Sequence, residues 1–469
     1  MGRSTSSGWL LAVVVAVGCA VVTADISPAG ADPGDLDPLF GSGGSVVTDP
    51  LGIGDSDRAS GVAVQSDGRI VVSTDVTGHG TFSGPLVGYT SSGALDEGFG
   101  SGGVAATDVA GCVLCGADMV LQPDDKILVV GAAFSLPLLF SPAVARFNPD
   151  GSVDPSFGSG GLAWSPHFDG VGNAVALQPD GKILVHSSGA VTRFNPDGSV
   201  DTEWGDSGAV RGATSRPGDD YFLYDADLAV APDGGVVVAG TGVALFGDED
   251  RRLVMARLEP DGLLDTDFGE SGLIRSRDLA GVGEIAIQPD GKIVAAGPAG
   301  ARFGLMRFHP DGTADQGFGE GGMATATDEA RAVAVTLGPN GMIVAAGDTW
   351  RPGDSGFDSM MLVARFTSDG ALDDRFGDRG VATISNDQVP NGGTAADTAL
   401  QADGKILVAG RDPGDADVMV HRLKVNTPPT IAVSGRGGCG GDTSATLQLE
   451  VADAETSADG LMIAARSSD

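Results

Sequence analysis

The chain has 469 residues, of which 75 are glycine and only 5% are aromatic. A formal net charge of −35 makes nucleic acid and anionic membranes poor partners for its surface. Hydrophobic residues make up 42% of the sequence, so disorder is not the default interpretation. Abundant glycine beside short apolar runs is typical of many short strands joined by tight turns, because glycine adopts the positive φ that such turns need.

The first 31 residues have the pattern of an export signal. Arg3 supplies a positive charge, residues 9–22 form an apolar run, and residues 29–31 (Ala-Gly-Ala) offer a small-residue cleavage site. We therefore expect residues 1–31 to be a signal peptide and the mature protein to be secreted. An alternative is lipoprotein processing at Cys19, which ends a loose lipobox. The apolar run is too short for a membrane span, and we expect none in the mature chain.

Two short motifs alternate seven times along the chain. The first, Leu-Asp-x-x-Phe-Gly-x-x-Gly, begins at Leu36, Leu95, Val153, Val200, Leu264, Ala314 and Leu372. The second, Gln-Pro-Asp-Gly-Lys-Ile followed by an apolar run, begins at Gln65, Gln122, Gln178, Ala231, Gln288, Gly338 and Gln401. Copies of the first motif lie about 56 residues apart on average. A repeat of this length, rich in short β-type runs, indicates a propeller, a solenoid or an array.

One repeat predicts four short strands. In residues 117–164, apolar runs at 117–122, 126–131, 143–147 and 162–164 alternate with turns. Pro-Asp-Gly between two runs predicts a hairpin, because proline fixes φ, aspartate caps the turn and glycine takes the left-handed position. Strands this short bury too little surface alone, and stacking them around an axis leaves only short edges. Four strands per repeat favour a propeller over a β-helix.

The two ends of the repeat array complement each other. The array starts with a fourth-type strand at 45–48 and ends near Lys424 without one. We therefore predict an all-β, seven-bladed β-propeller of residues 32–425 with four antiparallel strands per blade. The N-terminal strand is expected to join the last blade and close the ring.

Beyond the array, residues 426–431 are predicted to be a linker. Residues 432–469 carry β-type runs at 446–451 and 461–465, and they resemble the opening strands of an immunoglobulin-like module of bacterial surface proteins. Such a module needs roughly 100 residues. We therefore expect either an incomplete immunoglobulin-like segment or a tail that pairs with another element.

Three segments, Gln-Pro-Asp-Gly-Lys-Ile-Leu-Val, Ala-Arg-Phe-Asn-Pro-Asp-Gly-Ser and the first motif, resemble the bacterial delta-60 repeat. The resemblance covers about residues 35–425. It implies a propeller-forming repeat of secreted proteins and offers no catalytic residues to transfer. Some copies depart from the pattern: Trp204 replaces phenylalanine, Gly235 replaces lysine, and residues 339–341 read Pro-Asn-Gly.

The aromatic residue of the first motif occurs once per repeat at a fixed offset. It could form a ring of ligand-stacking platforms, but the fixed offset favours a structural role in the gap between neighbouring blades. The motif aspartate, for example Asp96 or Asp154, is predicted to cap the turn before it.

Cys112 and Cys115 form a Cys-x-x-Cys pair. A second pair or a thioredoxin-like context is missing, so zinc and redox roles are less favoured than a local disulfide that staples one loop of an exported protein. Acidic runs at 248–250 and 412–417 do not fit the EF-hand spacing, and calcium binding there is a minor alternative. We expect no cofactor and no metal site.

The uniform motif turns, between first and second and between third and fourth strands, are predicted to share one face of the disc. The variable loops then lie on the opposite face, where the longest insertions are 211–226 and 348–360. Since binding residues tend to lie on loops held by a rigid scaffold, we predict a monomeric, non-catalytic binding or adhesion scaffold for an extracellular protein or glycan. The candidate binding residues are Tyr221, Phe222, Tyr224, Trp350 and Phe357. Alternatives are aromatic residues that fold back onto the blades and a purely structural surface module.

The competing class is a secreted hydrolase or lyase with a site at the central channel. Its chemistry would need paired carboxylates or a histidine with a partner. The five histidines are scattered singly, at His79, His167, His186, His309 and His421. Nucleophile-elbow, zinc-protease and phosphate-loop motifs do not occur. The sequence thus predicts no catalytic residue, whereas carboxylates converging at the channel would favour an enzyme.

Overall fold

A computed structural model describes residues 15–17, 20–28, 33–50, 56–77, 84–107, 112–133, 140–165, 170–187, 189–212, 221–244, 251–353, 356–384, 393–411, 417–425, 430–434, 448–452 and 461–467. Side chains are described within 33–425, except at 56, 76–77, 112–116, 221–225, 244, 350–353 and 356–358. The chain divides into two units. The larger is Leu36–Leu423, and the smaller combines Met1–Asp35 with Lys424–Asp469.

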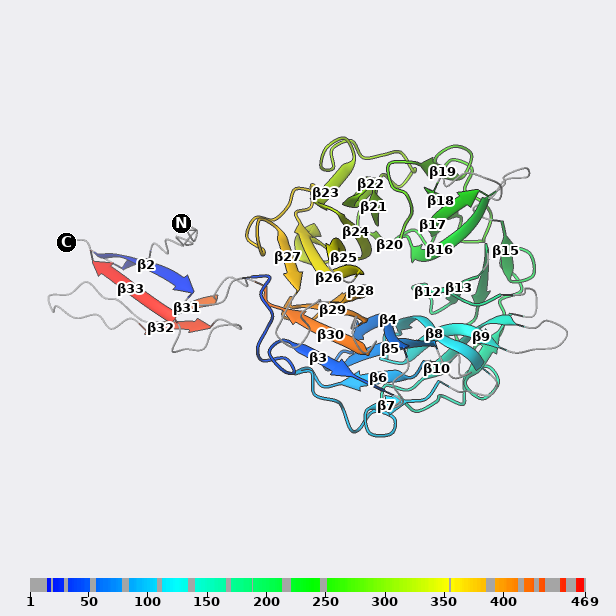
Figure 1. Cartoon of the computed structure of the whole chain (residues 1–469), viewed down its shortest axis with the longest axis horizontal. Coiled ribbons are helices and arrows are strands. Elements are labelled where there is room, and N and C mark those ends of the chain that lie inside the picture. The colour runs from blue at the N-terminus through cyan, green and yellow to red at the C-terminus, as the bar shows by residue number, and fades with distance from the viewer. Residues whose placement is uncertain are drawn as a thin grey trace. The chain divides into compact units, whose positions relative to one another are not determined.

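The larger unit consists of seven four-stranded antiparallel sheets around a central axis (Figure 1). The first three sheets contain β4 (Ser56–Val64), β5 (Ile70–Thr77), β6 (Leu86–Tyr89) and β7 (Val104–Ala105); β8 (Cys112–Leu121), β9 (Ile127–Ala133), β10 (Ser141–Phe147) and β11 (Leu162–Trp164); β12 (Ala174–Leu177), β13 (Ile183–Ser187), β14 (Ala190–Phe194) and β15 (Ala209–Arg211). The next three contain β16 (Tyr221–Val230), β17 (Val236–Ala244), β18 (Arg252–Leu258) and β19 (Leu273–Ser276); β20 (Glu284–Ile287), β21 (Ile293–Ala299), β22 (Arg302–Phe308) and β23 (Met323–Asp328); β24 (Ala330–Leu337), β25 (Ile343–Gly353), β26 (Gly356–Phe366) and β27 (Val381–Ile384). A short 3₁₀ turn, η1 (Pro339–Gly341), joins β24 to β25.

The seventh sheet takes strands from both ends of the array. Its order is β28 (Thr394–Leu400), β29 (Ile406–Arg411), β30 (Val418–Leu423) and β3 (Ser45–Thr48). β3 pairs antiparallel with β30, from Ser45 opposite His421 to Thr48 opposite Val418. In every sheet the strands follow one another in this 1-2-3-4 order. The predicted seven-bladed, all-β propeller with four antiparallel strands per blade is therefore confirmed.

The second motif forms the hairpin turn between first and second strands. In sheet 3, the Lys182 N–H donates to Asp180 Oδ1 at 3.1 Å, and the Gln178 N–H donates to the Lys182 carbonyl at 2.8 Å. Gly181 adopts φ +84°, the left-handed conformation that this turn requires. In sheet 2 Asp125 takes the glycine position with φ +61°, which aspartate tolerates better than most residues.

The core lies between neighbouring sheets. Phe157, for example, is fully buried among Val130 of sheet 2 and Ile183 and Val185 of sheet 3. Burying a phenylalanine stabilises the fold by about 2–3 kcal/mol, and each repeat contributes one such aromatic residue. The predicted structural role of these residues is confirmed, since they are fully buried at Phe40, Phe99, Phe157, Trp204, Phe268, Phe318 and Phe376.

The described residues of the smaller unit form two sheets. The first has the order β1 (Val15–Val17), β2 (Ala20–Pro28) and β33 (Leu461–Ser467), and the second pairs β31 (Thr430–Ser434) with β32 (Gln448–Ala452). β32 and β33 match the two β-type runs predicted in the tail, and β33 pairs with β2. The signal peptide and the immunoglobulin-like segment remain predictions.

The location expected for the Cys-x-x-Cys pair was wrong. Cys112 and Cys115 belong to β8 and not to a loop, because β8 extends beyond a bulge and Cys112 pairs with Ala133 of β9. The side chains of both cysteines lie outside the described residues, so the disulfide remains a prediction.

Candidate functional site

A cavity of about 700 Å³ lies where the first strands of the seven sheets meet. All seven sheets contribute lining residues, from β4 of sheet 1 to β28 of sheet 7. The lining contains four carboxylates, and the described residues that form it include no lysine, arginine or histidine. It is therefore an acidic cavity on the propeller axis.

The four carboxylates occupy one position of the repeat, four residues before the second motif. They are Asp118 in β8, Asp227 in β16, Glu284 in β20 and Asp397 in β28. The other three repeats have small residues there, namely Gly61, Ala174 and Ala334. Sheets 2, 4, 5 and 7 thus place an acidic group in the cavity.

Each of these carboxylates accepts a hydrogen bond from the first strand of the next sheet. The backbone N–H groups of Val175, Ile285, Val335 and Val62 donate to Asp118, Asp227, Glu284 and Asp397 over 2.7–2.8 Å. The three aspartates also accept the N–H of the residue that follows them, as Asp118 does from Met119 at 2.7 Å. The side chains therefore act as bridges between neighbouring blades.

Their environment disfavours the charged form. Withdrawal from bulk water and the neighbouring charges of Asp227 and Asp397 raise the pKa of Asp118 to about 8, despite the two backbone hydrogen bonds. Desolvation also raises the pKa of Asp227, Glu284 and Asp397. A carboxyl that holds its proton near neutral pH can serve as a general acid, so the cavity has a feature that some enzymes use.

These residues were missed from the sequence, although a signal was present. An acidic residue inside an otherwise apolar strand recurs at the same offset in Ala-Asp-Met-Val-Leu-Gln (117–122), Ala-Asp-Leu-Ala-Val-Ala (226–231), Gly-Glu-Ile-Ala-Ile-Gln (283–288) and Ala-Asp-Thr-Ala-Leu-Gln (396–401). Aligning the repeats would have revealed the position, because equivalent residues of first strands meet around the axis of a propeller.

Two of the histidines are core residues. His186 and His421 are 1% and 0% exposed, and desolvation lowers the pKa of each to about 4. His186 Nδ1 is 2.8 Å from Asn173 Oδ1, and His421 Nδ1 is 2.7 Å from Ser45 Oγ. His309 is half-buried in a turn, with Nε2 3.8 Å from Asp315 Oδ1. His79 and His167 lie outside the described residues.

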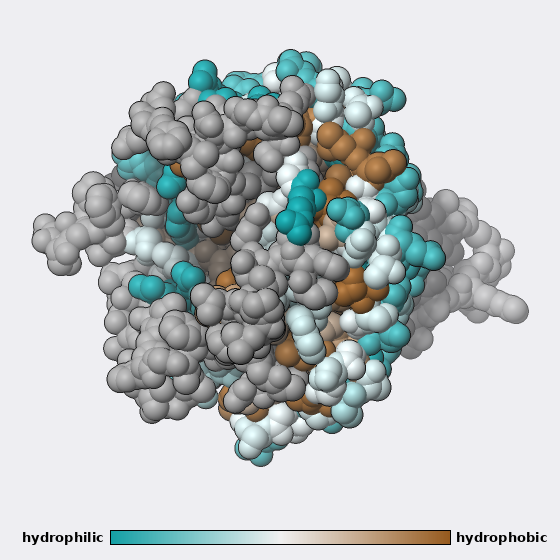
Figure 2. Space-filling view, turned by 90° about the vertical axis from the view of Figure 1, so that its right-hand side faces the viewer, coloured by the Kyte–Doolittle hydropathy of each residue, from teal (hydrophilic) through white to brown (hydrophobic). Residues whose placement is uncertain are grey.

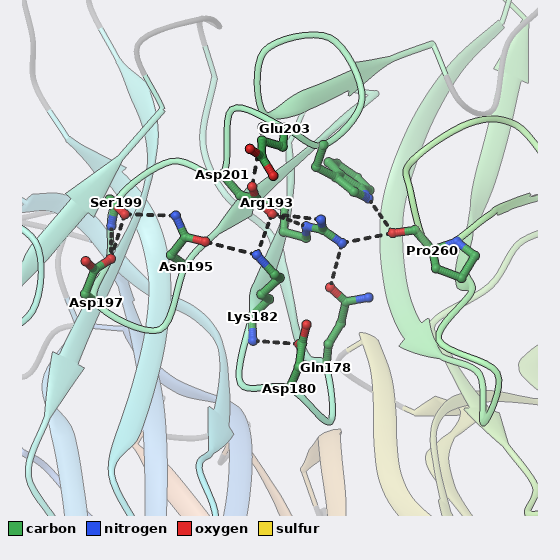
Figure 3. Close-up of polar contacts among 11 residues, drawn as sticks. Gln178, Asp180, Lys182, Arg193, Asn195, Asp197, Ser199, Asp201, Glu203 and Pro260 are labelled. Atoms are coloured by element: carbon green, nitrogen blue, oxygen red, sulfur yellow. Dashed lines mark hydrogen bonds and ion pairs between the residues drawn. The ribbon is translucent and has the colours of Figure 1, made fainter.

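The uniform motifs form a second recurring polar arrangement, shown for sheet 3 in Figure 3. Arg193 of β14 donates from Nε to Asp201 at 2.8 Å and from Nη1 to the Pro260 carbonyl of sheet 4 at 2.9 Å. Lys182 reaches the same Asp201 oxygen at 2.7 Å, and the Arg193 guanidinium stacks 5.2 Å from the Trp204 ring. Cation and motif aspartate thus join strands of one blade to the turn of the next.

The arginine recurs on the third strand of six sheets, at Arg146, Arg193, Arg257, Arg307, Arg365 and Arg422. Sheet 1 has Gly88 there, because a Cβ would lie 2.4 Å from the Phe99 ring. The motif aspartate caps the turn that follows it and not the preceding turn that was predicted: Asp154 Oδ1 accepts the Ser156 N–H at 3.0 Å. The second carboxylate oxygen of Asp154 binds Arg146 at 2.9 Å. The uniform face is therefore used for joining blades.

The candidate binding residues lie in strands and not in irregular loops, which corrects the sequence prediction. Tyr221, Phe222 and Tyr224 are in β16, where they pair with residues 241–244 of β17. Trp350 lies in β25 and Phe357 in β26. The backbones of these segments satisfy one another by pairing, which extends the ladders beyond the positions that the repeat pattern suggests. Their side chains lie outside the described residues.

β25 and β26 form a projecting hairpin. Their ladder runs from Ile343 opposite Phe366 to Gly353 opposite Gly356, whereas β24 pairs with β25 only up to Thr349 and β27 pairs with β26 only up to Met361. Among the described residues, no third strand pairs with the last part of this ladder, from Trp350 opposite Ser359 to Gly353 opposite Gly356. We call residues 350–353 and 356–359 the β25–β26 arm.

The described surface carries scattered apolar groups. Figure 2 shows hydrophobic and hydrophilic groups interspersed over the described part of one side. The most exposed large apolar residues are Leu39 and Leu263, 72% and 64% exposed, and both belong to the uniform motif turns.

In the described part of the chain, no three His, Cys, Asp or Glu side chains are grouped so that they could hold a metal ion. The acidic runs at 248–250 and 412–417 lie almost wholly outside the described residues. No helix within the described ranges is long and apolar enough to span a membrane.

Comparison with protein families gives one match. The family described as "Domain of unknown function (DUF5122) beta-propeller" matches residues 122–157, 178–203, 231–268 and 288–318. Each segment starts at the second motif and ends at or next to the aromatic residue of the first. The match supports a β-propeller repeat family. No curated protein sequence matches the chain.

Several solved bacterial structures match the chain at low identity. A protein of unknown function from Dyadobacter fermentans is 12% identical with a TM-score of 0.41, and the match covers 81% of this chain and 98% of that one. PorZ of Porphyromonas gingivalis, a surface component of the type-IX secretion system, is 12% identical with a TM-score of 0.46 over 83% of this chain and 50% of that one. A gluconolactonase from Xanthomonas campestris is 16% identical with a TM-score of 0.35 over 64% of this chain and 90% of that one. At such identities the likeness concerns the fold alone.

Proposed function

We propose that this protein is an exported, non-catalytic β-propeller that binds an extracellular protein or carbohydrate through its variable face. This is the face of the second-to-third and fourth-to-first connections. The observation that carries the proposal is the β25–β26 arm, which extends past the four-stranded sheet on that side. A paired hairpin presents side chains at low conformational cost, because its backbone is already ordered.

Two further observations support this assignment. The uniform face has its charged side chains engaged between blades, as Arg193 is with Asp201 and Pro260. The acidic groups of the central cavity likewise accept backbone N–H groups of the next sheet. The variable face is then the part of the disc whose side chains the blade contacts require least.

A binding screen against glycans and bacterial surface proteins tests the proposal. The Trp350→Ala/Phe357→Ala variant removes two large apolar side chains from the arm, and we expect it to lose at least about tenfold in affinity, as truncating an aromatic anchor at an interface does. The matched control, Leu39→Ala/Leu263→Ala, removes apolar groups from the uniform face and should bind like the wild type. Unchanged binding after truncating the arm and the other variable connections would refute the proposal.

A hydrolase or lyase is the second candidate function, and the convergence of four carboxylates on one cavity favours it. Asp118 would serve as the general acid, since its carboxyl holds a proton near neutral pH. The test is turnover of a panel of ester, lactone and glycoside substrates by the wild type and by Asp118→Asn. A loss of about 100-fold or more in kcat/KM in a folded variant would establish the enzyme, and absence of any turnover removes it.

A further inference from the structure

A second cavity, of about 210 Å³, lies between sheets 4 and 5 on the uniform face. Its lining comes from the second-motif turns of both sheets, from Arg257 of β18 and from Pro310. Repeat 4 departs from the motif at two positions beside this cavity: Ala231 stands where five repeats have glutamine, and Gly235 stands where most have lysine or arginine.

Sister repeats show what the missing glutamine does. In sheet 3 the Gln178 carboxamide oxygen accepts a hydrogen bond from Arg193 Nη1 at 3.3 Å, and its nitrogen donates to the Gly234 carbonyl of sheet 4 at 3.2 Å. Arginine Nη1 also donates to the carboxamide oxygen in sheets 5 and 7, from Arg307 to Gln288 at 3.4 Å and from Arg422 to Gln401 at 3.2 Å. One carboxamide therefore joins a guanidinium to the turn of the next blade.

Repeat 4 keeps both partners of this carboxamide and lacks the carboxamide itself. Arg257 is the counterpart of Arg193 and makes the equivalent bond to the next sheet, from Nη1 to the Pro310 carbonyl at 3.0 Å. Gly291 is the counterpart of Gly234, and no other described residue donates to its carbonyl. Arg257 and Gly291 both line the cavity, so a donor and an acceptor remain where Gln178 lies in sheet 3.

We propose that this cavity binds a primary carboxamide on an unbranched aliphatic stem, the group that a glutamine side chain carries. Its oxygen accepts from Arg257, its nitrogen donates to the Gly291 carbonyl, and its stem packs against Pro232, Val237 and Ile293. An aliphatic stem suits these apolar walls.

The surroundings disfavour a carboxylate ligand, although arginine often binds one. Arg257 is already paired with Asp233 and lies 3.5 Å from Asp265. A carboxylate would bring further negative charge beside these groups and Asp290, and it has no hydrogen to donate to the Gly291 carbonyl. Gly235 also shapes the cavity, because a Cβ at this position would lie 3.1 Å from the Arg257 guanidinium. Glycine in place of lysine therefore leaves space for the guanidinium where it lies.

The test uses saturation-transfer difference NMR on the full chain with butyramide as the probe, for which we expect a Kd on the order of millimolar for so small a ligand. Ala231→Gln restores the sister residue, whose own side chain fills the cavity, and we expect the probe signal to fall at least about fivefold. Gln178→Ala opens the equivalent gap between sheets 3 and 4 and should add a second site. Butyrate and N,N-dimethylbutyramide serve as control compounds. Any signal they give should be the same for the wild type and for Ala231→Gln.

Two arms distinguish the source of the amide. A glutamine-containing pentapeptide that competes with butyramide identifies a protein side chain, and a pentapeptide that does not compete identifies a small free amide. Equal probe signals from the wild type and Ala231→Gln, with both proteins folded, would overturn the proposal. The Trp350→Ala/Phe357→Ala variant should keep its butyramide signal, so failure of the variable-face proposal is separable from failure of this one.

Discussion

At the scale of single residues, the third-strand arginine is the main polar contact between blades. Arg193 binds Asp201, reaches the Pro260 carbonyl of the next sheet and stacks on Trp204. Hydrogen bonds from Lys182 and Arg193 outweigh the effect of burial and hold the pKa of Asp201 below its usual value. The group is buried and fully paired, the condition under which removing one member costs most.

Replacing this arginine should destabilise the propeller markedly. We expect Arg193→Met to lower the free energy of unfolding by about 3 kcal/mol, because Asp201 would keep only Lys182 in a buried site. Urea denaturation of the larger unit measures this change in the free energy of unfolding. Arg302→Met is the matched control: its partner Asp328 is exposed, and we expect a loss below about 1 kcal/mol. Equal losses in the two variants would contradict the assigned role.

At the scale of elements, strand identity was predictable and strand length was not. The Pro-Asp-Gly turns and apolar runs fixed where the strands of a repeat begin and end at the uniform face, as at β10 and β11. At the other face the sequence varies between repeats, and the length of each strand is set by backbone pairing. Residues 221–224 and 350–353 therefore belong to ladders, although their sequence carries no repeating pattern.

The contribution of β3 to the seventh sheet gives a second prediction. A chain that starts at residue 33 should fold as a cooperative unit. A chain that starts at residue 49 also lacks β3 and Phe40, and we expect it to lose more than about 3 kcal/mol of stability or to aggregate, because β30 becomes an exposed edge and a buried phenylalanine is gone. Equal stability of the two truncations, measured by thermal unfolding, would show that β3 is dispensable.

At the scale of the whole molecule, the central carboxylates come from four different sheets whose first strands meet at one cavity. Asp118 and Asp397 are far apart in the chain, and yet the charge of Asp397 raises the pKa of Asp118 in the same cavity. The repeat count predicted that first strands would surround an axis. The side chains that face this axis are set by the register of the first strands. Bulges shift that register, for example between Val113 and Asp118, and a pattern of apolar runs does not reveal such shifts.

These carboxylates predict how stability depends on pH. Asp118 has a higher pKa in the folded state, about 8, than in the unfolded state, near 3.9. Its contribution to stability is fully present below about pH 3.9 and is lost as the pH rises through the folded-state pKa. Thermal unfolding should therefore occur at lower temperature at pH 9 than at pH 5. Asp118→Asn should show a smaller decrease.

The control for this experiment is Asp150→Asn. Hydrogen bonds from Ser152 hold the pKa of Asp150 below its usual value, so this group is ionised throughout the range and its replacement should leave the decrease unchanged. A decrease in Asp118→Asn as large as in the wild type would show that the central carboxylates do not titrate in this window.

Hydrogen–deuterium exchange, measured with and without the ligand that the binding screen identifies, tests most directly whether recognition occurs at the variable face while the cavity carboxylates join blades. We expect protection in residues 349–360 of the β25–β26 hairpin and at the start of β16, with the first strands around Asp118 and Asp397 unchanged. Protection confined to those first strands, with the hairpin unaffected, would contradict the claim and favour a site in the central cavity.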